Sequence, residues 1–368
     1  MKSSFKPSSL KCANMPHRTT PMLMLMLMLV AALFPAPGHA KNLKIPAAPL
    51  FFPLPPDEPR IQYLTSFSSE RELQGERKFF EFIVGVQKSE RIIDKPYGIA
   101  ASPGKYYICD TGADAVEIAD LKKRKLNFFQ PGGEGTLGLP INIAVDTDGT
   151  RYIADTGRNM VLVYNGDNYA GGLGKANEMK PCGVALTKSR IYVTDLQNHC
   201  VRVYDKASRN LLFTFPKPGS DKKARLYSPT NVAIDQQGRV DVSDTGGFCV
   251  NIYDAEGNFL RTFGGIGLSP GRFARPKGIA VDREGRIYVV DASTELVQLF
   301  DPQGQVLMYF GDPSHSATGL PAGITIDYDN VGLFQKYVAP GFTVEYLILV
   351  ANQAGGNKIS VFGFGHKK

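Results

Sequence analysis

The sequence predicts an all-β fold, a six-bladed β-propeller, and three observations support this prediction. A similar stretch recurs six times in the 368 residues, and each copy opens at a proline. Every copy contains short runs rich in Val, Ile and Tyr that are separated by turn residues, and no copy carries a helical period. The opening prolines are Pro96, Pro140, Pro181, Pro229, Pro276 and Pro321, which gives spacings of 44, 41, 48, 47 and 45 residues.

The second copy shows how one unit is built. An apolar run over residues 143–145 ends at Asp146, a turn containing glycine follows, and a second run reaches Asp155. A third, alternating run closes the copy. Most copies add a fourth run, such as "NFLRTFGG" from Asn258 and "QVLMYFGD" from Gln305. Four antiparallel strands per repeat are typical of a propeller blade.

The two ends of the repeat region predict how the ring closes. The sixth copy stops after its third run, residues 358–365, whereas "RIQYLTSFSS" from Arg60 resembles a fourth run but precedes the first copy. We therefore expect Ile61–Phe67 to supply the outer strand of the sixth blade, which removes an exposed sheet edge. The predicted propeller covers residues 61–368, a length that such rings use as a single domain.

Residues 1–40 have the pattern of a signal peptide. Four basic residues precede an apolar run over residues 22–34, and small residues end the segment at Gly38 and Ala40. The apolar run is too short to span a bilayer, so we expect a secreted or periplasmic protein without a transmembrane anchor. Residues 41–60 contain six prolines, which predict an extended lead-in.

Two insertions break the repeat. Residues 70–94 contain a stretch, 76–86, that places Phe79, Ile83 and Val86 on one helical face. Residues 328–345 lengthen the sixth blade and include Phe334 and Phe342. We expect both insertions to pack on the propeller. The alternative is an exposed patch that binds a partner.

Charge and cysteine content exclude some functions. The formal net charge of +7 falls to +3 without residues 1–40, because these carry four of the 42 basic residues and no acidic one. The remaining basic clusters lack interleaved aromatic residues, so we expect no nucleic-acid binding. Cys200 and Cys249 occupy equivalent positions in adjacent blades, too far apart for a disulfide, and we expect free thiols at these positions and at Cys109 and Cys182.

The repeated pattern Pro-x-Gly-Ile-Ala-Val-Asp, then Asp-Gly-x-Ile-Tyr-Val-x-Asp-Thr-Gly, resembles the NHL repeat. This resemblance implies a six-bladed propeller that serves as a binding platform, with a ligand face formed by the loops before the first strand and after the second. The resemblance also implies a partner in an extracellular or periplasmic assembly, because secreted bacterial proteins of this type are often associated with such assemblies, including electron-transfer cytochromes. The chain departs from the pattern where such repeats often carry Arg before the third strand, at Ala115, Met160, Cys200, Cys249 and Leu296.

An acidic or amide residue ends the second strand of every copy. A ring of carboxylates could hold a cation. Alternatively, each side chain accepts hydrogen bonds from its own turn, and we favour this structural role because the residue recurs in every blade. The residues are Asp110, Asp155, Asp195, Asp244, Asp291 and Asn352.

The strongest candidates for a ligand face lie at the channel mouth. Two positions after the opening proline, four copies carry Gly, but the second and fourth carry Asn142 and Asn231. A Pro-x-Asn start resembles the calcium-binding strands of gluconolactonase-like propellers. The position directly after each opening proline holds a residue that would line the same rim: Tyr97, Ile141, Cys182, Thr230, Lys277 and Ala322. We expect a packed neutral plug there and no cofactor, with calcium as the alternative.

The histidines do not predict a catalytic metal. A zinc propeller such as the peptidylglycine amidating lyase needs several histidines that converge on the axis, whereas His199, His315 and His366 fall at unequal places in the repeat. We therefore expect a monomeric, non-catalytic binding or scaffolding propeller that engages a protein partner through its loop face. The alternative is a metal-dependent hydrolase or lyase, gluconolactonase-like or amidating-lyase-like, with an axial site.

Overall fold

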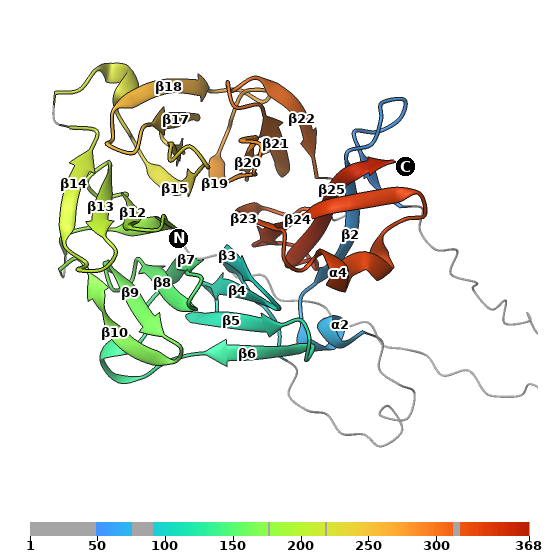
Figure 1. The fold of residues 1–368 in the computed structure, drawn as a ribbon, viewed down its shortest axis with the longest axis horizontal. Coiled ribbons are helices and arrows are strands. Elements are labelled where there is room, and N and C mark those ends of the chain that lie inside the picture. The colour runs from blue at the N-terminus through green and yellow to red at the C-terminus, as the bar shows by residue number, and fades with distance from the viewer. Residues whose placement is uncertain (1–48, 76–90, 176, 218, 312–316, 368) are drawn as a thin grey trace, which may run out of the picture. The chain divides into compact units, whose positions relative to one another are not determined.

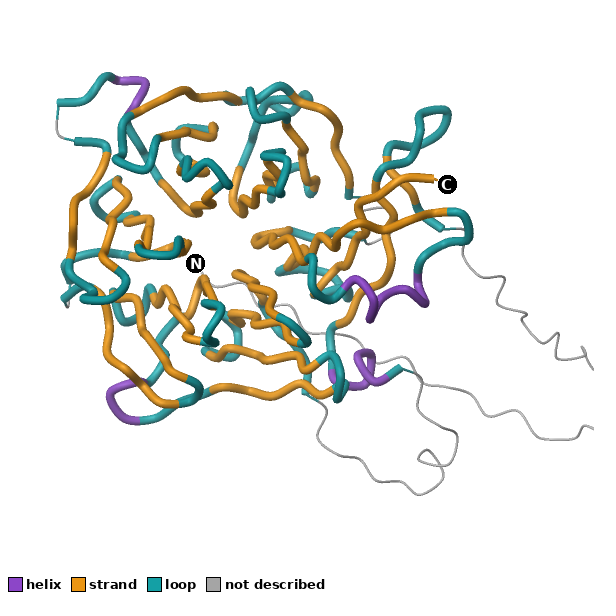
Figure 2. The backbone as a smooth tube through the Cα atoms, viewed as in Figure 1, coloured by secondary structure: helices purple, strands orange, loops and turns teal. Residues whose placement is uncertain are grey.

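The computed structural model describes residues 49–75, 91–175, 177–217, 219–311 and 317–367. These residues form six antiparallel sheets arranged in a ring, which confirms the predicted six-bladed β-propeller (Figure 1). The few short helical segments lie on the outside of the ring (Figure 2). Within the described residues, no helix has the length and apolar character that crossing a membrane requires.

Each of the first five blades has four strands in sequence order. Blade one contains β3 (Pro96–Ser102), β4 (Lys105–Asp110), β5 (Ala115–Asp120) and β6 (Lys125–Phe129), and blade two contains β7 (Pro140–Val145), β8 (Thr150–Asp155), β9 (Met160–Asn165) and β10 (Asn168–Leu173). Blade three contains β11 (Pro181–Leu186), β12 (Arg190–Asp195), β13 (Cys200–Asp205) and β14 (Leu211–Phe215), and blade four contains β15 (Pro229–Ile234), β16 (Val240–Asp244), β17 (Cys249–Tyr253) and β18 (Phe259–Gly264). Blade five contains β19 (Pro276–Val281), β20 (Ile287–Asp291), β21 (Leu296–Phe300) and β22 (Val306–Phe310).

Blade six joins the two ends of the described chain. Its sheet contains β23 (Pro321–Asp327), β24 (Phe342–Asn352), β25 (Ile359–Lys367) and then β2 (Ile61–Phe67). Phe67 pairs with Ile359 and Ile61 with Phe364, so the predicted closing strand is confirmed with its predicted bounds. A two-residue strand, β1 (Phe51–Phe52), adds a fifth strand that the sequence did not predict. The closure buries Ile61 completely.

The core lies between neighbouring blades rather than in one central cluster. Side chains alternate along a strand, so Ile153 of β8 packs towards blade one while Tyr152 and Ala154 pack towards blade three. Both faces of the inner strands are therefore buried, which explains why their sequences are apolar almost throughout. The four cysteines among the described residues, Cys109, Cys182, Cys200 and Cys249, are free thiols.

The insertion in blade six packs on the ring. It forms α4 (Val331–Phe334) and the single turn η4 (Gln335–Tyr337). Phe334 is buried and stacks on Tyr106 of blade one, with ring centroids 6.2 Å apart. Asn330 accepts a hydrogen bond from the amide of Gly104 at 2.6 Å, so this insertion ties blade six to blade one.

The other insertion is described only in part. It begins with the short helix α2 (Glu70–Gln74), which lies beside the outer strand of blade one, where Glu70 accepts a hydrogen bond from the amide of Leu126. The helix predicted over residues 76–86 lies outside the described residues. Two single turns, η1 (Gly133–Gly135) and η2 (Lys222–Ala224), occur in the connections before blades two and four.

Candidate functional site

The opening prolines pair with the residues that end the second strands, so both sets lie on one face of the ring. Pro96 is opposite Asp110 and Pro140 is opposite Asp155, and the remaining blades repeat this register. We call this side the proline face. It carries the connections between blades and the turns between second and third strands.

The buried acids of the proline face are occupied by backbone amides. Asp110 accepts hydrogen bonds from the amides of Asp94 at 2.6 Å, Lys95 at 2.8 Å and Gly112 at 2.9 Å. Each such carboxylate thus ties its own turn to the segment before its blade, a link that the sequence did not reveal. Amide donors also surround Asp155, Asp195, Asp244 and Asp291, and Asn352 accepts from Gly319. These contacts are architectural and leave little capacity to hold a cation.

The first strands approach one another closely around the axis, and this explains the glycines in the Pro-x-Gly pattern. A Cβ added to Gly98 would lie 2.6 Å from Cα of Asn142, and one added to Gly323 would lie 2.0 Å from the carbonyl oxygen of Tyr97. No side chain fits there without movement of the backbone. In blades two and four an Asn replaces this Gly, so these two blades place a side chain near the centre of the ring.

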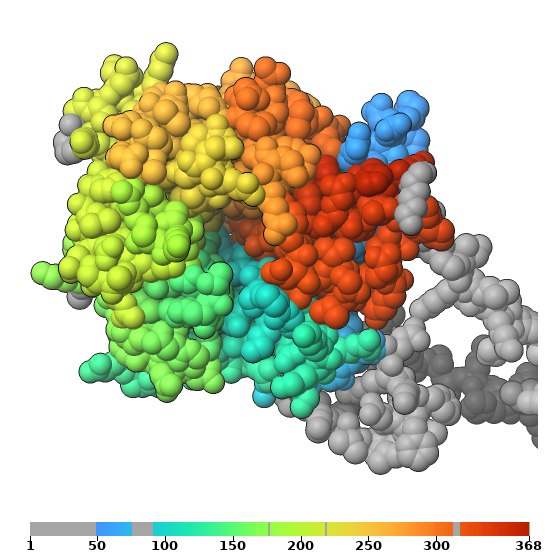
Figure 3. Space-filling model, viewed as in Figure 1, coloured from blue at the N-terminus to red at the C-terminus, as the bar shows by residue number. Residues whose placement is uncertain are grey.

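Asn142 and Asn231 meet across the axis. The Asn142 side-chain amide donates a hydrogen bond to Oδ1 of Asn231, which joins blade two to blade four. Asn231 is buried, and its own Nδ2 has no partner among the described residues. The pair lies at one end of a cavity of about 310 Å³ that is lined by the first strands of all six blades. The space-filling view shows a narrow hollow near the middle of the ring (Figure 3).

Tyr97 and Lys277 fill the mouth on the proline-face side. The Lys277 ammonium lies 4.7 Å from the centre of the Tyr97 ring, although the two residues belong to blades five and one. It also donates a hydrogen bond to Oε1 of Gln353 at 3.3 Å. Lys277 is only 6% exposed, and burial, followed by the nearby Arg275, lowers its pKa to about 8. The mouth is packed, but it is not a neutral plug, because Lys277 is mostly protonated at pH 7.

The other mouth residues are neutral near pH 7. Burial raises the pKa of Tyr97 to about 12 and that of the Cys182 thiol to about 11, so Cys182 is not a reactive thiolate. The Thr230 hydroxyl lies 3.0 Å from the hydroxyl of Thr245, which in turn bonds the carbonyl of Pro276 in the next blade. Thr230 thus belongs to a hydrogen-bonded link between blades four and five.

A basic rim surrounds this mouth. Lys95, Lys180 and Arg275 directly precede the opening prolines of blades one, three and five, and all three are exposed. Arg275 is close enough to lower the pKa of both Tyr97 and Lys277, and Lys180 lowers that of Cys182. None of the three has an ion pair within the described residues. The sequence did not single them out, because the positions before the opening prolines carry no constant residue.

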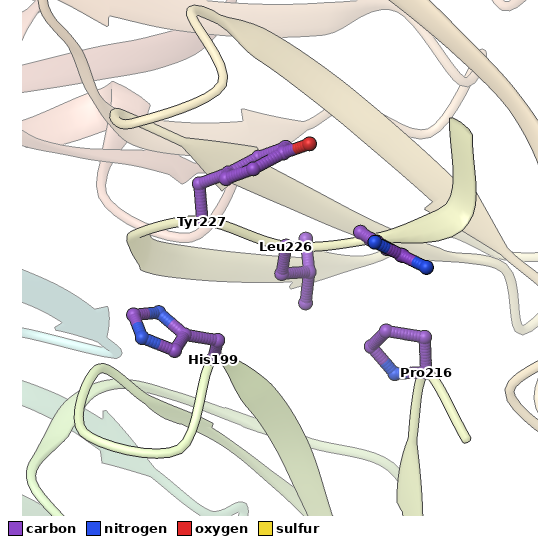
Figure 4. Close-up of a pocket in the computed structure, with 5 residues that line it drawn as sticks. His199, Pro216, Leu226 and Tyr227 are labelled. Carbon is purple, nitrogen blue, oxygen red and sulfur yellow. The ribbon is translucent and has the colours of Figure 1, made fainter. Parts of the chain in front are cut away.

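A separate surface pocket of about 280 Å³ lies between blades three and four on the proline face. Its lining residues are His199, Pro216, Arg225, Leu226 and Tyr227, and His199 and Tyr227 extend from different blades into it (Figure 4). His366 instead contacts Glu345 at 2.9 Å near the end of β25, and His315 lies outside the described residues. In the part of the chain that the structure describes, no three His, Cys, Asp or Glu side chains are grouped to hold a metal ion.

Comparison with known proteins supports the fold but no family. No family model matches the chain, and no curated protein sequence matches it. Solved structures do match. A streptogramin B lyase is 14% identical with a TM-score of 0.51, covering 74% of this chain and 84% of the lyase. A protein of unknown function from Bacteroides thetaiotaomicron is 18% identical with a TM-score of 0.57, and the match covers 83% of this chain and 75% of that protein. A gluconolactonase from Xanthomonas campestris is 16% identical with a TM-score of 0.52, and the match covers 86% of this chain and 97% of the gluconolactonase. At these identities the likeness shows the propeller fold alone.

Proposed function

We propose that this chain is a secreted, non-catalytic binding propeller of the NHL-repeat type, and that it engages an acidic protein partner through its proline face. The observation that carries the proposal is the packed mouth with its rim of basic side chains, Lys95, Lys180 and Arg275, which have no ion pairs among the described residues. Exposed basic side chains that have no ion pair attract and orient a negatively charged partner.

Exposed apolar side chains on the same face favour a protein as the partner. Tyr227 is 55% exposed in the connection before blade four, and Ile266 and Leu268 are 73% and 76% exposed in the connection before blade five. Large apolar side chains within a charged surface are typical of protein interfaces, and Tyr and Arg are frequent anchors there. The pocket lined by His199, Arg225 and Tyr227 could receive one partner side chain.

The second candidate is a metal-dependent hydrolase or lyase with an axial site. It is favoured by Asn142 and Asn231, whose amide oxygens are suitable ligands for a hard cation and which meet at one end of the axial cavity. The described lining of that cavity contains no carboxylate and no histidine. The donor set therefore does not fit a calcium or zinc site, and we assign no catalytic step to it.

The binding proposal is tested with a fluorescein-labelled octaglutamate peptide and an octalysine peptide as the control ligand. We compare the wild-type protein with the charge-reversed variant Lys95→Glu, Lys180→Glu, Arg275→Glu. The matched control variant carries Lys122→Glu, Lys123→Glu and Lys188→Glu, three exposed positions in turns on the opposite face. We expect the proline-face variant to bind octaglutamate at least about tenfold more weakly and the control to change by less than about threefold. Equal losses in both variants would contradict the proposal.

The enzymatic candidate is tested by the metal content of the protein, purified without chelator and measured by elemental mass spectrometry. We expect less than stoichiometric calcium and zinc. One metal ion per chain that is lost in the Asn142→Ala variant would instead support the hydrolase or lyase.

A further inference from the structure

We propose that the mouth of the proline face contains a carboxylate-binding site formed by Lys277 and Lys358, which contact Gln353, together with the nearby Arg275, and that an Asp or Glu side chain of the partner protein occupies it. The inference rests on the proposed binding function and names the contact at its centre. The first observation that supports it is that Lys277 is buried and has no ion pair within the described residues.

Lys277 is a buried cation with little compensation. Its ammonium carries three donors, but the described residues provide one hydrogen bond, to Oε1 of Gln353, and the face of the Tyr97 ring. A charged group that is removed from water is costly unless an opposite charge is nearby. Lys277 has no ion pair within the described residues, so an anion that reached it would replace the missing partner.

Two further cations lie near Lys277 or its glutamine partner. The Lys358 ammonium donates a hydrogen bond to the main-chain oxygen of Gln353 at 3.1 Å. Arg275 is two residues before Lys277 on the rim of the mouth and contributes to lowering the pKa of Lys277. Lys277 and Lys358 therefore both contact Gln353, and the repulsion between Lys277 and the nearby Arg275 decreases when an anion binds.

The nearby acids of these blades are already engaged. Asp291 accepts hydrogen bonds from the amides of Ala274 and Arg275, and Glu295 accepts one from the amide of Leu320 at 3.0 Å. Both carboxylates thus serve the connections between blades. They do not form an ion pair with any of the three cations.

The geometry favours a carboxylate on a projecting side chain. Two carboxylate oxygens can accept hydrogen bonds from two ammonium groups at once. The mouth below is closed by the packed side chains of Tyr97 and Lys277, so the anion must arrive from the proline face. An acidic side chain on the surface of a docked protein meets this requirement.

Protonation of Lys277 couples binding to pH. Tyr97 contacts its ammonium, Arg275 lies close enough to lower its pKa, and Cys182 lies near Tyr97; Tyr97 and Cys182 titrate only near pH 12 and pH 11. Lys277 therefore loses its charge first as the pH rises, and carboxylate binding weakens between about pH 7 and pH 9.

The test is a titration of labelled octaglutamate into the full-length wild-type protein and the variants Lys277→Met and Lys277→Arg, at pH 6.5 and pH 9. Lys277→Met removes the charge and keeps much of the side-chain volume, and Lys277→Arg keeps the charge at both pH values. We expect Lys277→Met to bind about tenfold more weakly at pH 6.5 and to lose the pH dependence, and Lys277→Arg to bind well at both values. Lys188→Met, an exposed lysine on the opposite face, is the control.

Several results would overturn the inference. The inference fails if Lys277→Met binds octaglutamate as tightly as the wild type. In that case the proposed function would still stand if the proline-face variant, Lys95→Glu, Lys180→Glu, Arg275→Glu, bound the peptide weakly. Displacement of octaglutamate by inorganic phosphate, with none by free glutamate or acetate at the same concentration, would also overturn it by indicating a phosphate site. If Lys277→Met fails to fold, Lys358→Met provides the readout, with an expected loss of about threefold in affinity, and an unchanged affinity would count against the site.

Discussion

Replacement of Glu117 by Gln should stabilise the protein, and the effect should depend on pH. Glu117 lies in β5 of blade one, is fully buried, and neither of its carboxylate oxygens has a donor among the described residues. Burial, reinforced by Asp110 and Asp94, raises its pKa to about 10. At pH 7 the folded protein therefore keeps a proton on Glu117, and the buried side chain is neutral.

The size of the expected stabilisation follows from the difference between the pKa of Glu117 in the folded protein and its pKa in the unfolded chain. In the unfolded chain Glu117 ionises with its ordinary pKa of 4.5, and each pH unit above that value favours unfolding by about 1.4 kcal/mol until the folded pKa is reached. The stability contributed by this group is complete below pH 4.5 and is lost as the pH rises towards 10. At pH 7 the loss amounts to about 3 kcal/mol. Glutamine cannot ionise, so it removes this loss.

Blade five indicates that glutamine is compatible with this position. Gln298 is the equivalent residue, seven positions after the buried acid of its blade, and it hydrogen-bonds the amide of Gly271 and the carbonyl of Arg272. The reverse change, Gln298→Glu, should therefore destabilise the protein, increasingly so as the pH rises. Glu134→Gln, at an exposed position in the connection before blade two, should have little effect.

The assay is urea unfolding between pH 4 and pH 8, followed by far-UV circular dichroism because the chain contains no tryptophan. Glu117→Gln should match the wild type near pH 4 and exceed its unfolding free energy by about 3 kcal/mol at pH 7. A difference that stays constant over this range would refute the protonated, buried state of Glu117, and so would a less stable variant at pH 7.

Two further predictions concern stability. Asp241 is almost fully buried with Oδ1 unpartnered, and burial, then Asp235, raises its pKa to about 8, so Asp241→Asn should stabilise the protein increasingly up to about pH 8 and no further. A gain that continued to rise beyond pH 9 in the same urea experiment would contradict this assignment. Ile61→Ala, in the closing strand, should lower the unfolding free energy by about 2–4 kcal/mol, whereas Leu211→Ala, in an exposed outer strand, should change it by less than about 0.5 kcal/mol. Similar losses in both variants would argue against closure through β2.

The repeat made much of the fold predictable. The constant prolines and the alternating runs predicted six blades, and the pattern of Ile61–Phe67 was regular enough to place it correctly as the last outer strand. Strand β1 could not be found in this way, because two residues in a proline-rich stretch show no period. The burial of Glu117 was also not predictable, because a single polar residue in an alternating strand is normally assigned to the solvent side. The structure instead pairs Glu117 with buried Ile108 of the neighbouring strand.

The site was less predictable, because its contacts join positions that do not repeat. Lys277 and Asn231 were recognised as residues near the axis, since they lie beside the opening prolines. The contact of Lys277 with Gln353 spans 76 residues, and neither Gln353 nor Lys358 has an equivalent in the other blades. The packing of blade six against blade five brings them together, so no local pattern could reveal these contacts.

The central claim is that the proline face binds acidic protein surfaces through its basic rim. It is tested most directly by the affinity of octaglutamate for the proline-face variant and for the opposite-face variant, each measured at about 20 mM and 200 mM salt. We expect that only the proline-face variant loses affinity, and that the wild type binds more weakly at high salt while the variant changes little. Equal affinity of the two variants at low salt would contradict it.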